Sequence, residues 1–280
     1  MDIADPKLVD IMKDHHIIGV MHFAAHSKVG ESMVNPAIYY ENNVVGSYHL
    51  IESARAAGVK HFVFSSTAAV YGEPEVVPIR EDAQLQPTNV YGRTKLMIEE
   101  MLSDYSSIYG STYVALRYFN AAGADPSGTI GEDHHPETHL IPLVLDAARG
   151  KREHITVFGT DYDTADGTCV RDYIHVNDLA AAHVLAMDYL RKGGESQVFN
   201  LGSGNGFSVK EIIETAKEVT GIDIPVQYGE RRAGDPGTLI ASSEKIKNLL
   251  GWDPKFSNVA DVIKDAWKWH TSHPDGFNSK

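Results

Sequence analysis

The composition is that of an ordinary globular protein with a strong negative charge. The chain has 280 residues, of which 42% are hydrophobic and 22% charged, and its formal net charge at pH 7 is −13. This charge argues against nucleic acid or an anionic membrane as the main partner. No apolar run reaches the roughly 18 residues of a membrane span. The acidic N-terminus lacks an apolar signal segment, and a single cysteine, Cys169, allows no disulfide framework, so we expect a cytoplasmic protein.

Predicted helices and strands alternate along the first half of the chain. In order, we expect a helix over 6–16, a strand over 19–24, a helix over 35–57, a strand over 61–66, a helix over 89–109 and a strand over 112–120. Asn35-Pro36 is typical of a helix N-terminus, and Gly58 of a helix C-terminus. The alternation predicts an α/β protein with a doubly wound parallel sheet and helices on both faces.

Polar side chains fall where the predicted strands end. They are Ser65, Ser66, Thr67, Tyr118 and Asn120. Ligands of open parallel sheets bind outside the carboxyl ends of the strands, so we expect the functional site at this edge.

The texture changes from about Ala124, where clusters of Gly, Pro, Asp and His separate shorter elements. Here we expect helices over 178–191, 212–220 and 258–270, strands over 197–201 and 238–241, and a helix that stops at Gly251. Asn177 is a candidate N-cap for the first of these helices, and Ser208 with Glu211 forms a capping-box pattern before the second.

Tyr91 and Lys95 lie four residues apart near the start of the helix predicted over 89–109. Residues at this spacing share one face of a helix. A nearby ammonium group favours the phenolate form of tyrosine, which can then exchange a proton with a sugar or alcohol hydroxyl. The alternative is a half-buried tyrosine and a surface lysine that merely share a helix.

Two patterns suggest ligand sites but are better explained as loops. Residues 202–206, Gly-Ser-Gly-Asn-Gly, follow a predicted strand, yet the third glycine of a dinucleotide-binding turn is replaced by Phe207. The histidine-rich run 132–139 invites a metal site. Pro136 prevents helical pairing of His135 with His139, and no second ligand cluster is evident, so we expect a solvated loop and no metal.

Several longer segments, taken together with Thr67, Tyr91 and Lys95, resemble a known family. They are His22-Phe23-Ala24-Ala25, Val29-Gly30-Glu31-Ser32, Asn42-Asn43-Val44, Arg117-Tyr118-Phe119-Asn120, the run from Val170 to Val176, and the run from Arg231 to Asp235. As a set they resemble the UDP-hexose 4-epimerases of the extended short-chain dehydrogenase/reductase family, from near residue 2 to the C-terminus.

The resemblance implies the interconversion of UDP-glucose and UDP-galactose with tightly bound NAD. Tyr91 would take the proton of the sugar 4-hydroxyl while hydride passes from carbon 4 to NAD⁺. Lys95 would lower the pKa of Tyr91 and hold the nicotinamide ribose, and Thr67 would hydrogen-bond the same sugar hydroxyl. Many relatives have serine where this chain has Thr67, which keeps the hydroxyl but restricts its rotamers.

The resemblance also implies a set of binding residues. For NAD they are Asp2, Ile3, Phe23, Ala24, Ala25, Ser27, Asn42, Ser65, Tyr91, Lys95 and Tyr118, with Ser27 in a position where some relatives carry lysine. For the UDP-hexose they are Thr67, Tyr91, Asn120, Leu140, Phe158, Arg171, Tyr173, Arg232, Asp235 and Leu239.

Within the UDP-hexose set, Arg171 and Arg232 would clamp the pyrophosphate through charge-assisted contacts. A surface ion-pair network is the alternative for these two arginines. Phe158 would stack on uracil, and Asp235 would bind a ribose hydroxyl. The modest size of Leu239 would leave room for UDP-GlcNAc as well as UDP-glucose.

The chain departs from the family at its start. Family members open with a Gly-rich β-α-β segment, and no such turn precedes residue 19. We therefore expect an N-terminally truncated, Rossmann-like NAD domain over 1–123 and a UDP-sugar domain over 124–280, with segments near 169–202 returning to the first sheet. We expect poor NAD affinity and impaired activity as a consequence.

Two other functions stay open. A nucleotide-sugar dehydratase or decarboxylase of the same family is disfavoured, because Ala68 and Ala69 follow Thr67 where dehydratases usually carry acidic groups. A non-catalytic UDP-sugar-binding module would use Arg171 and Arg232 and retain no NAD. The family further suggests a homodimer, formed in part by the helices over 35–57 and 89–109.

Overall fold

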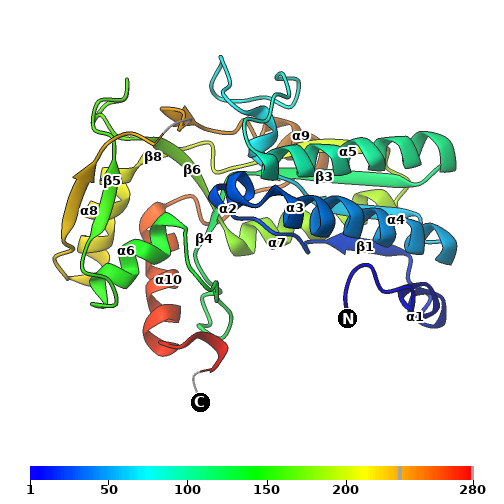
Figure 1. Cartoon of the computed structure of the whole chain (residues 1–280), viewed down its shortest axis with the longest axis horizontal. Coiled ribbons are helices and arrows are strands. Elements are labelled where there is room, and N and C mark those ends of the chain that lie inside the picture. The colour runs from blue at the N-terminus through cyan, green and yellow to red at the C-terminus, as the bar shows by residue number, and fades with distance from the viewer. Residues whose placement is uncertain (233–234, 279–280) are drawn as a thin grey trace.

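A four-stranded parallel sheet forms the framework of the first part of the molecule (Figure 1). The structure is a computed structural model that describes residues 1–232 and 235–278. The strands are β1 (Gly19–His22), β2 (His61–Ser65), β3 (Thr112–Tyr118) and β7 (Gln197–Leu201), in the order β1-β2-β3-β7. Their register pairs Gly19 with His61, His61 with Thr112, and Val114 with Gln197. The predicted doubly wound parallel sheet is thus confirmed.

Helices cover both faces of this sheet because its strands are apolar on both sides. Val63, Val114 and Leu116 pack under α7 (Val176–Arg191). On the other face, Phe62 and Phe64 pack against α4 (Gly46–Ala57) and α5 (Val90–Tyr109). Successive side chains of a strand point to opposite faces, so each strand serves both layers.

The segment predicted as one helix over 35–57 is divided into three. It consists of α3 (Pro36–Tyr39), the π-helix η1 (Tyr40–Val45) and α4, and it follows α2 (Val29–Val34), which the sequence did not indicate. Within η1, Asn43 is fully buried and its amide pairs with the backbone of His26 at 2.8 and 3.0 Å. The wide turn therefore accompanies a long-range contact that no local pattern reveals.

The second part of the molecule is built on smaller sheets. One has the order β10-β6-β4, with β8 antiparallel to β6, and another pairs β5 with β9. The strands are β4 (Asn120–Ala122), β5 (Ile155–Phe158), β6 (Val170–His175), β8 (Gly206–Ser208), β9 (Val226–Gly229) and β10 (Thr238–Leu239). The strand predicted over 112–120 is thus two strands, and the chain changes sheet at Phe119.

The remaining helices pack around these strands and at the ends of the chain. They are α1 (Leu8–Asp14), the 3-10 turn η2 (Ala68–Tyr71), α6 (Leu140–Ala148), α8 (Val209–Thr220), α9 (Glu244–Leu250), α10 (Val259–Ser272) and the 3-10 turn η3 (Gly276–Asn278). An apolar cluster that includes Val144, Ile212 and Ile263 joins α6, α8 and α10. None of the described helices combines the length and apolar composition of a membrane-spanning segment.

Helix capping agrees with the sequence in one case and differs in another. The capping box of Ser208 and Glu211 is present at the start of α8. Asn177 is not the N-cap of α7, because His175 holds that position and its Nδ1 accepts the Asn177 N–H at 3.1 Å. The Asn177 amide instead donates to Asp125 at 3.0 Å.

Candidate active site

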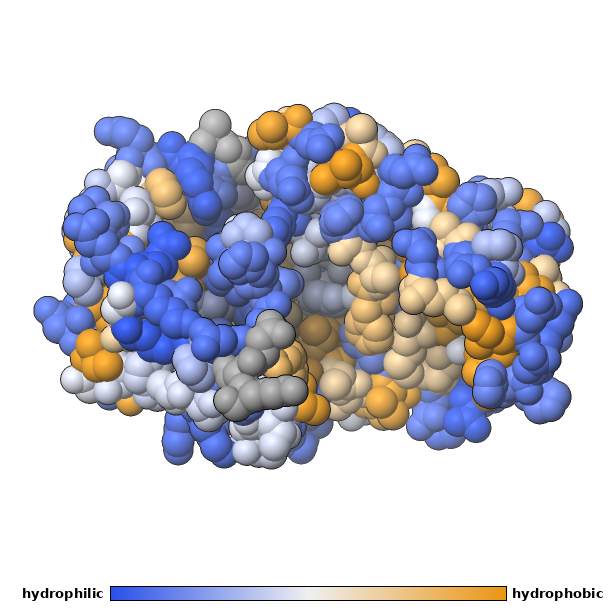
Figure 2. Space-filling model, turned by 60° about the horizontal axis from the view of Figure 1, so that its bottom comes forward, coloured by the Kyte–Doolittle hydropathy of each residue, from blue (hydrophilic) through white to orange (hydrophobic). Residues whose placement is uncertain are grey.

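A cavity of about 550 Å³ lies between the two parts of the molecule, at the carboxyl ends of β2 and β3. Figure 2 shows the surface hollowed between these parts. Twelve of the predicted site residues line it, namely Phe23, Ala25, Ser27, Ser65, Thr67, Tyr91, Lys95, Tyr118, Asn120, Arg171, Asp235 and Leu239. The cavity therefore lies where the sequence predicts the site, at the carboxyl ends of the strands.

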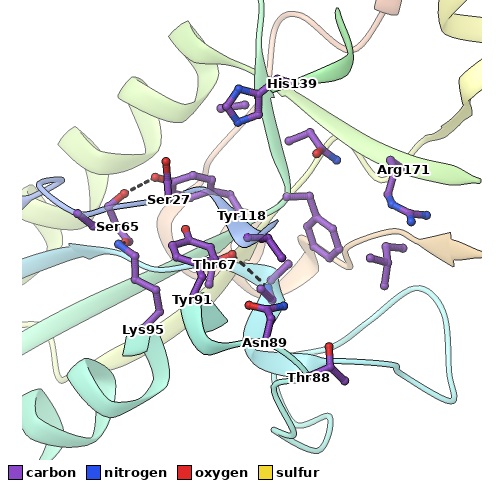
Figure 3. Close-up of a pocket in the computed structure, with 18 of the residues that line it drawn as sticks. Ser27, Ser65, Thr67, Thr88, Asn89, Tyr91, Lys95, Tyr118, His139 and Arg171 are labelled. Atoms are coloured by element: carbon purple, nitrogen blue, oxygen red, sulfur yellow. Dashed lines mark hydrogen bonds between the residues drawn. The ribbon is translucent and has the colours of Figure 1, made fainter. Parts of the chain in front are cut away.

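Thr67, Tyr91 and Lys95 lie together at one end of this cavity, and Arg171 lies at the other (Figure 3). Tyr91 and Lys95 come from the first two turns of α5, whose N-cap Asn89 accepts the Gly92 N–H at 2.8 Å. Thr67 caps the 3-10 turn after β2, and its Oγ1 accepts the Ala69 N–H at 3.1 Å. One helix start and one strand end thus bring the three groups together.

The pKa values of Tyr91 and Lys95 move in opposite directions, and burial is the main cause of both shifts. Burial raises the pKa of Tyr91, and a hydrogen bond with Thr67 opposes this only in part. Burial lowers the pKa of Lys95 to about 7, against a weaker effect of Glu99. The expected lowering of the Tyr91 pKa by Lys95 is therefore not found. Lys95 Nζ lies 5.9 Å from the Tyr91 ring centre and donates to the Ser65 carbonyl at 2.8 Å.

Residues predicted to hold NAD form the wall next to Lys95. Ser65 and Tyr118, at the ends of β2 and β3, are joined by a hydrogen bond between their hydroxyl groups. Phe23 follows β1 and is 55% exposed, so an aromatic face is open to a ligand. Among the described residues, Lys95 has one hydrogen bond to a protein acceptor, although an ammonium group has three donors. A polar ligand such as a ribose would satisfy the others, so these residues fit NAD.

Four residues predicted to bind NAD lie outside the cavity lining. They are Asp2, Ile3, Ala24 and Asn42. Ile3 packs against the apolar cluster under α4, and Asp2 accepts the Ala4 N–H at 2.8 Å. The Asn42 amide donates to Asn43 at 3.0 Å. Their predicted contacts with NAD stay predictions.

The opposite wall carries the candidate groups for the nucleotide-sugar. Arg171, on β6, has its guanidinium 3.8 Å from the Asp235 carboxylate, and Arg232 pairs with the same carboxylate at 2.8 Å. The Arg232 guanidinium also lies 4.9 Å from the ring centre of Phe158. Both arginines therefore converge on one acid, although only Arg171 and Asp235 line the cavity. Asn120 donates to the Asp172 carbonyl at 3.0 Å.

Four residues predicted to bind the UDP-hexose do not line the cavity. They are Leu140, Phe158, Tyr173 and Arg232. Tyr173 shares a face of β6 with Arg171 but lies two residues further along the strand, where it is buried in the apolar core. Leu140 packs on the same core from the start of α6. Phe158 is 40% exposed at the end of β5.

Residues 202–205 of the Gly-rich run form a loop, as predicted, whereas Gly206 begins β8. The N–H groups of Ser203 and Gly204 donate to the Asp172 carboxylate at 2.8 and 3.2 Å. The backbone N–H groups of this loop therefore bind the Asp172 carboxylate of the chain itself and not the phosphate of a ligand.

The histidine-rich run 132–139 is a loop, as predicted, and His134 and His135 are exposed, but four of its side chains converge. Glu132, His134, Glu137 and His139 bring their ligand atoms within 4.8 Å of one another. Glu132, His134 and His139 also line the cavity. Pro136 does prevent a helical pair, but the loop folds back and sets His134, and not His135, beside His139. The only local sign of this cluster was the alternation of Glu132, His134, Glu137 and His139 along the run. Helical spacing rules do not apply to it, because the run is a loop.

The parallel sheet with a Thr-Tyr-Lys group at its carboxyl edge defines an α/β protein of the short-chain dehydrogenase/reductase class. The sequence profile of the NAD-dependent epimerase/dehydratase family matches residues 1–202. The chain belongs to this family.

Relatives and solved structures agree with this assignment. The chain is 55% identical over 280 residues to a UDP-glucose 4-epimerase of Halalkalibacterium halodurans, covering 100% of this chain and 84% of the relative. A crystal structure of a UDP-glucose 4-epimerase matches with a TM-score of 0.97 and 54% identity over 100% of this chain and 85% of the other. A UDP-glucose 4-epimerase from Brucella ovis in complex with NAD has a TM-score of 0.94 and 47% identity, covering 95% and 82%.

These matches bear on the expected N-terminal truncation. The first relative aligns with all 280 residues of the chain. The comparisons do not support the expectation of a missing segment, and the poor NAD affinity and impaired activity expected from it stay predictions.

Proposed function

We propose that the chain interconverts UDP-glucose and UDP-galactose by transient oxidation at sugar carbon 4. The observation that carries this proposal is the meeting of Thr67, Tyr91 and Lys95 in one cavity with Arg171. A relative named UDP-glucose 4-epimerase is 55% identical over all 280 residues of the chain, which supports the same chemistry here.

The cofactor side of the cavity suits NAD. When bound, NAD⁺ supplies a hydride acceptor that is regenerated within the reaction and not consumed. Phe23, Ser27, Ser65, Lys95 and Tyr118 would hold it, because they line one wall and include an ammonium group with donors to spare.

The chain's own hydroxyl groups would move the proton. Thr67 and Tyr91 both line the cavity, and Thr67 is close enough to lower the Tyr91 pKa, so a sugar 4-hydroxyl in reach of Thr67 would also be in reach of Tyr91. A Tyr91 phenolate requires a nearby positive charge, since burial raises the pKa of its hydroxyl. Lys95, whose Nζ lies 5.9 Å from the Tyr91 ring centre, is the candidate for that charge, although it does not lower the Tyr91 pKa in this structure.

The diphosphate end of the substrate would be held by arginine. Arg171 faces the cavity and Arg232 lies beside it, both paired with Asp235. Guanidinium groups suit diphosphate oxygens because they donate two parallel hydrogen bonds. The substrate diphosphate would replace the Asp235 carboxylate as the partner of both arginines. Phe158 would stack on uracil.

The site gives less support to elimination chemistry. Ala68 and Ala69 follow Thr67 and line the cavity, where a dehydratase would need an acidic group. A non-catalytic UDP-sugar-binding module is the remaining alternative, and NAD and UDP binding experiments distinguish it from an enzyme.

Replacing Tyr91 by phenylalanine tests the proposal. Because the variant lacks the hydroxyl that exchanges the proton, we expect the rate of UDP-galactose conversion to fall by about 10²–10⁴-fold. A coupled assay for UDP-glucose formation measures this rate. Tyr228→Phe is the matched control, since Tyr228 is 62% exposed on β9 and does not line the cavity.

NAD and UDP binding separate an enzyme from a binding module. The wild-type protein should contain or take up NAD, seen by absorbance and fluorescence, and Tyr91→Phe should keep both NAD and UDP affinity. A wild-type protein that binds UDP but neither holds NAD nor converts UDP-galactose would contradict the proposal.

We further propose a cytoplasmic homodimer with an NAD domain over 1–123 and a UDP-sugar domain over 124–280. Apolar side chains on α4 and α5 support the dimer, because Tyr48, Ile108 and Tyr109 are 45%, 70% and 57% exposed. Light scattering on the purified chain would measure the mass.

A further inference from the structure

The loop between β4 and α6 carries a cluster of potential metal ligands on the rim of the active-site cavity. Its members are Glu132, His134, Glu137 and His139, and three of them line the cavity. Figure 3 shows the imidazole of His139 across the cavity from Lys95. The side chains of Glu137 and His139 are 12% and 39% exposed, so the cluster is held by the protein yet open to an ion.

The four ligand atoms are the Nδ1 atoms of both histidines and the Oε1 atoms of both glutamates. The two Nδ1 atoms are 3.2 Å apart. Glu132 Oε1 lies 2.9 Å from Nδ1 of His134 and 3.1 Å from Nδ1 of His139. Glu137 Oε1 lies 3.9 and 2.9 Å from the same two nitrogens.

These separations are close to those of a tetrahedral ion site. Zinc binds imidazole nitrogen and carboxylate oxygen at about 2.0–2.2 Å, so tetrahedral ligands stand roughly 3.3–3.6 Å apart. Of the five measured separations, four (2.9, 2.9, 3.1 and 3.2 Å) are shorter than this range and one (3.9 Å) is longer. An ion at the centre would need only small movements of the side chains.

Without a metal, the same four groups form an ion-pair network in which each histidine Nδ1 lies 2.9 Å from a glutamate Oε1. In that network both imidazoles are protonated, and their Nδ1 atoms lie 3.2 Å apart. The rings also stack, with centres 4.9 Å apart, so two positive charges would lie face to face. With neutral imidazoles, the two carboxylates give the cluster a charge of −2, which a divalent cation balances.

Further contacts hold the ligands in place. Glu137 Oε1 accepts the N–H groups of Thr138 and His139 at 2.6 and 2.8 Å. The Glu132 carbonyl accepts Trp269 Nε1 at 2.8 Å, which ties the loop to α10. Outer hydrogen bonds of this kind orient metal ligands and strengthen their binding.

We propose that Glu132, His134, Glu137 and His139 bind one divalent transition-metal ion of the zinc type. Imidazole with carboxylate suits Zn²⁺, whereas Mg²⁺ and Ca²⁺ prefer oxygen alone. Four protein ligands leave no open position, which is typical of a structural site and not of a catalytic one. The ion would fix the loop that forms the cavity rim, with no part in the transfer of hydride or proton.

Cobalt titration tests the site directly. Chelator-treated protein is titrated with Co²⁺, whose visible absorption distinguishes tetrahedral from octahedral coordination. We expect one Co²⁺ per chain with the intense tetrahedral band, displaced by one equivalent of Zn²⁺. Native mass spectrometry gives the stoichiometry, and Zn²⁺ should raise Tm because it binds only the folded state.

Paired variants assign the ligands. Because each removes one ligand, His139→Gln and His134→Gln should weaken binding by more than the about 10–100-fold that follows loss of an outer hydrogen-bond partner. His135→Gln is the matched control, since His135 is exposed in the same loop and outside the cluster. Glu137→Gln keeps the shape of the side chain but removes its charge, so it should also weaken binding. Circular dichroism verifies that each variant folds.

Three outcomes would overturn the proposal. They are an octahedral spectrum, binding that His134→Gln and His139→Gln leave unchanged, and an equal loss in His135→Gln. Each would assign the bound metal to other residues, such as the remaining histidines among the 14 in the chain. None of these readouts depends on epimerase activity, so the test stands apart from the proposed function.

Discussion

The ammonium group of Lys95 lies in a buried part of the site, where lost hydration disfavours its positive charge. The residue is 3% exposed, and its ammonium group lies 4.9 Å from the Phe64 ring centre. Glu99 lies one turn further along α5, but its carboxylate is engaged by Arg117 and Ser66. Lost hydration therefore outweighs the nearby negative charge and lowers the Lys95 pKa from 10.5 to about 7.

This shift predicts a pH-dependent stability. Between pH 7 and pH 10.5 the unfolded chain binds a proton that the folded Lys95 does not, so the contribution of Lys95 to stability rises with pH and is lowest below pH 7. Lys95→Met should be more stable than wild type by about 1–3 kcal/mol near pH 6.5, and the difference should shrink toward pH 10.

Urea denaturation at several pH values measures the difference. Lys264→Met, which changes an exposed lysine of α10, is the control and should show no such trend. A Lys95→Met variant whose stability relative to wild type does not change with pH would disprove the assigned cause.

At the level of elements, the site depends on a close approach between α5 and the turn η2. A Cβ atom added to Gly92 would lie 2.6 Å from the Ala69 carbonyl oxygen. Gly92 follows Tyr91, and Ala69 lies two residues after Thr67. Glycine at position 92 therefore sets the distance between the two hydroxyl groups that would share the sugar proton.

Gly92→Ala should separate these elements. Relief of the clash requires a backbone shift, so we expect a destabilisation of about 1–3 kcal/mol and a loss of activity on the order of 10²-fold for a displacement near 1 Å. Urea denaturation and the coupled assay measure the two effects. Gly30→Ala is the control, because nothing lies within 4 Å of its added Cβ.

The two parts of the molecule are joined by a buried carboxylate. Asp172, on β6, accepts the N–H groups of Ser203, Gly204 and Ala241 at 2.8, 3.2 and 3.1 Å. Ser203 follows β7 of the first sheet, and Ala241 follows β10 of the second. Asp172 thereby connects both sheets next to Arg171, whose side chain faces the cavity.

Asp172→Asn should weaken this connection. The amide group replaces one acceptor oxygen by a donor, so at least one buried N–H loses its partner. We expect unfolding to become easier by about 2–4 kcal/mol, together with weaker UDP binding because Arg171 loses its support. Chemical denaturation and calorimetric titration with UDP are the measurements. Asp223→Asn, at a side chain 95% exposed, should change neither.

Local patterns in the sequence predicted much of the fold and one end of the site. The strands ending at Ser65 and Tyr118, the capping box of Ser208 and the i, i+4 pair of Tyr91 and Lys95 are set by neighbours within a few residues. Side-chain period, capping and turn chemistry operate over that distance, so they can be recognised without knowledge of the fold.

Only the tertiary structure decided which distant residues meet. Arg171 and Tyr173 share one face of β6, yet Arg171 lines the cavity beside β10 whereas Tyr173 pairs with Asn120 of β4 and is buried in the apolar core. The lowered pKa of Lys95 depends on burial by other elements, and His134 meets His139 through a loop reversal. Such contacts arise from packing between segments far apart in the chain, about which local propensity carries no information.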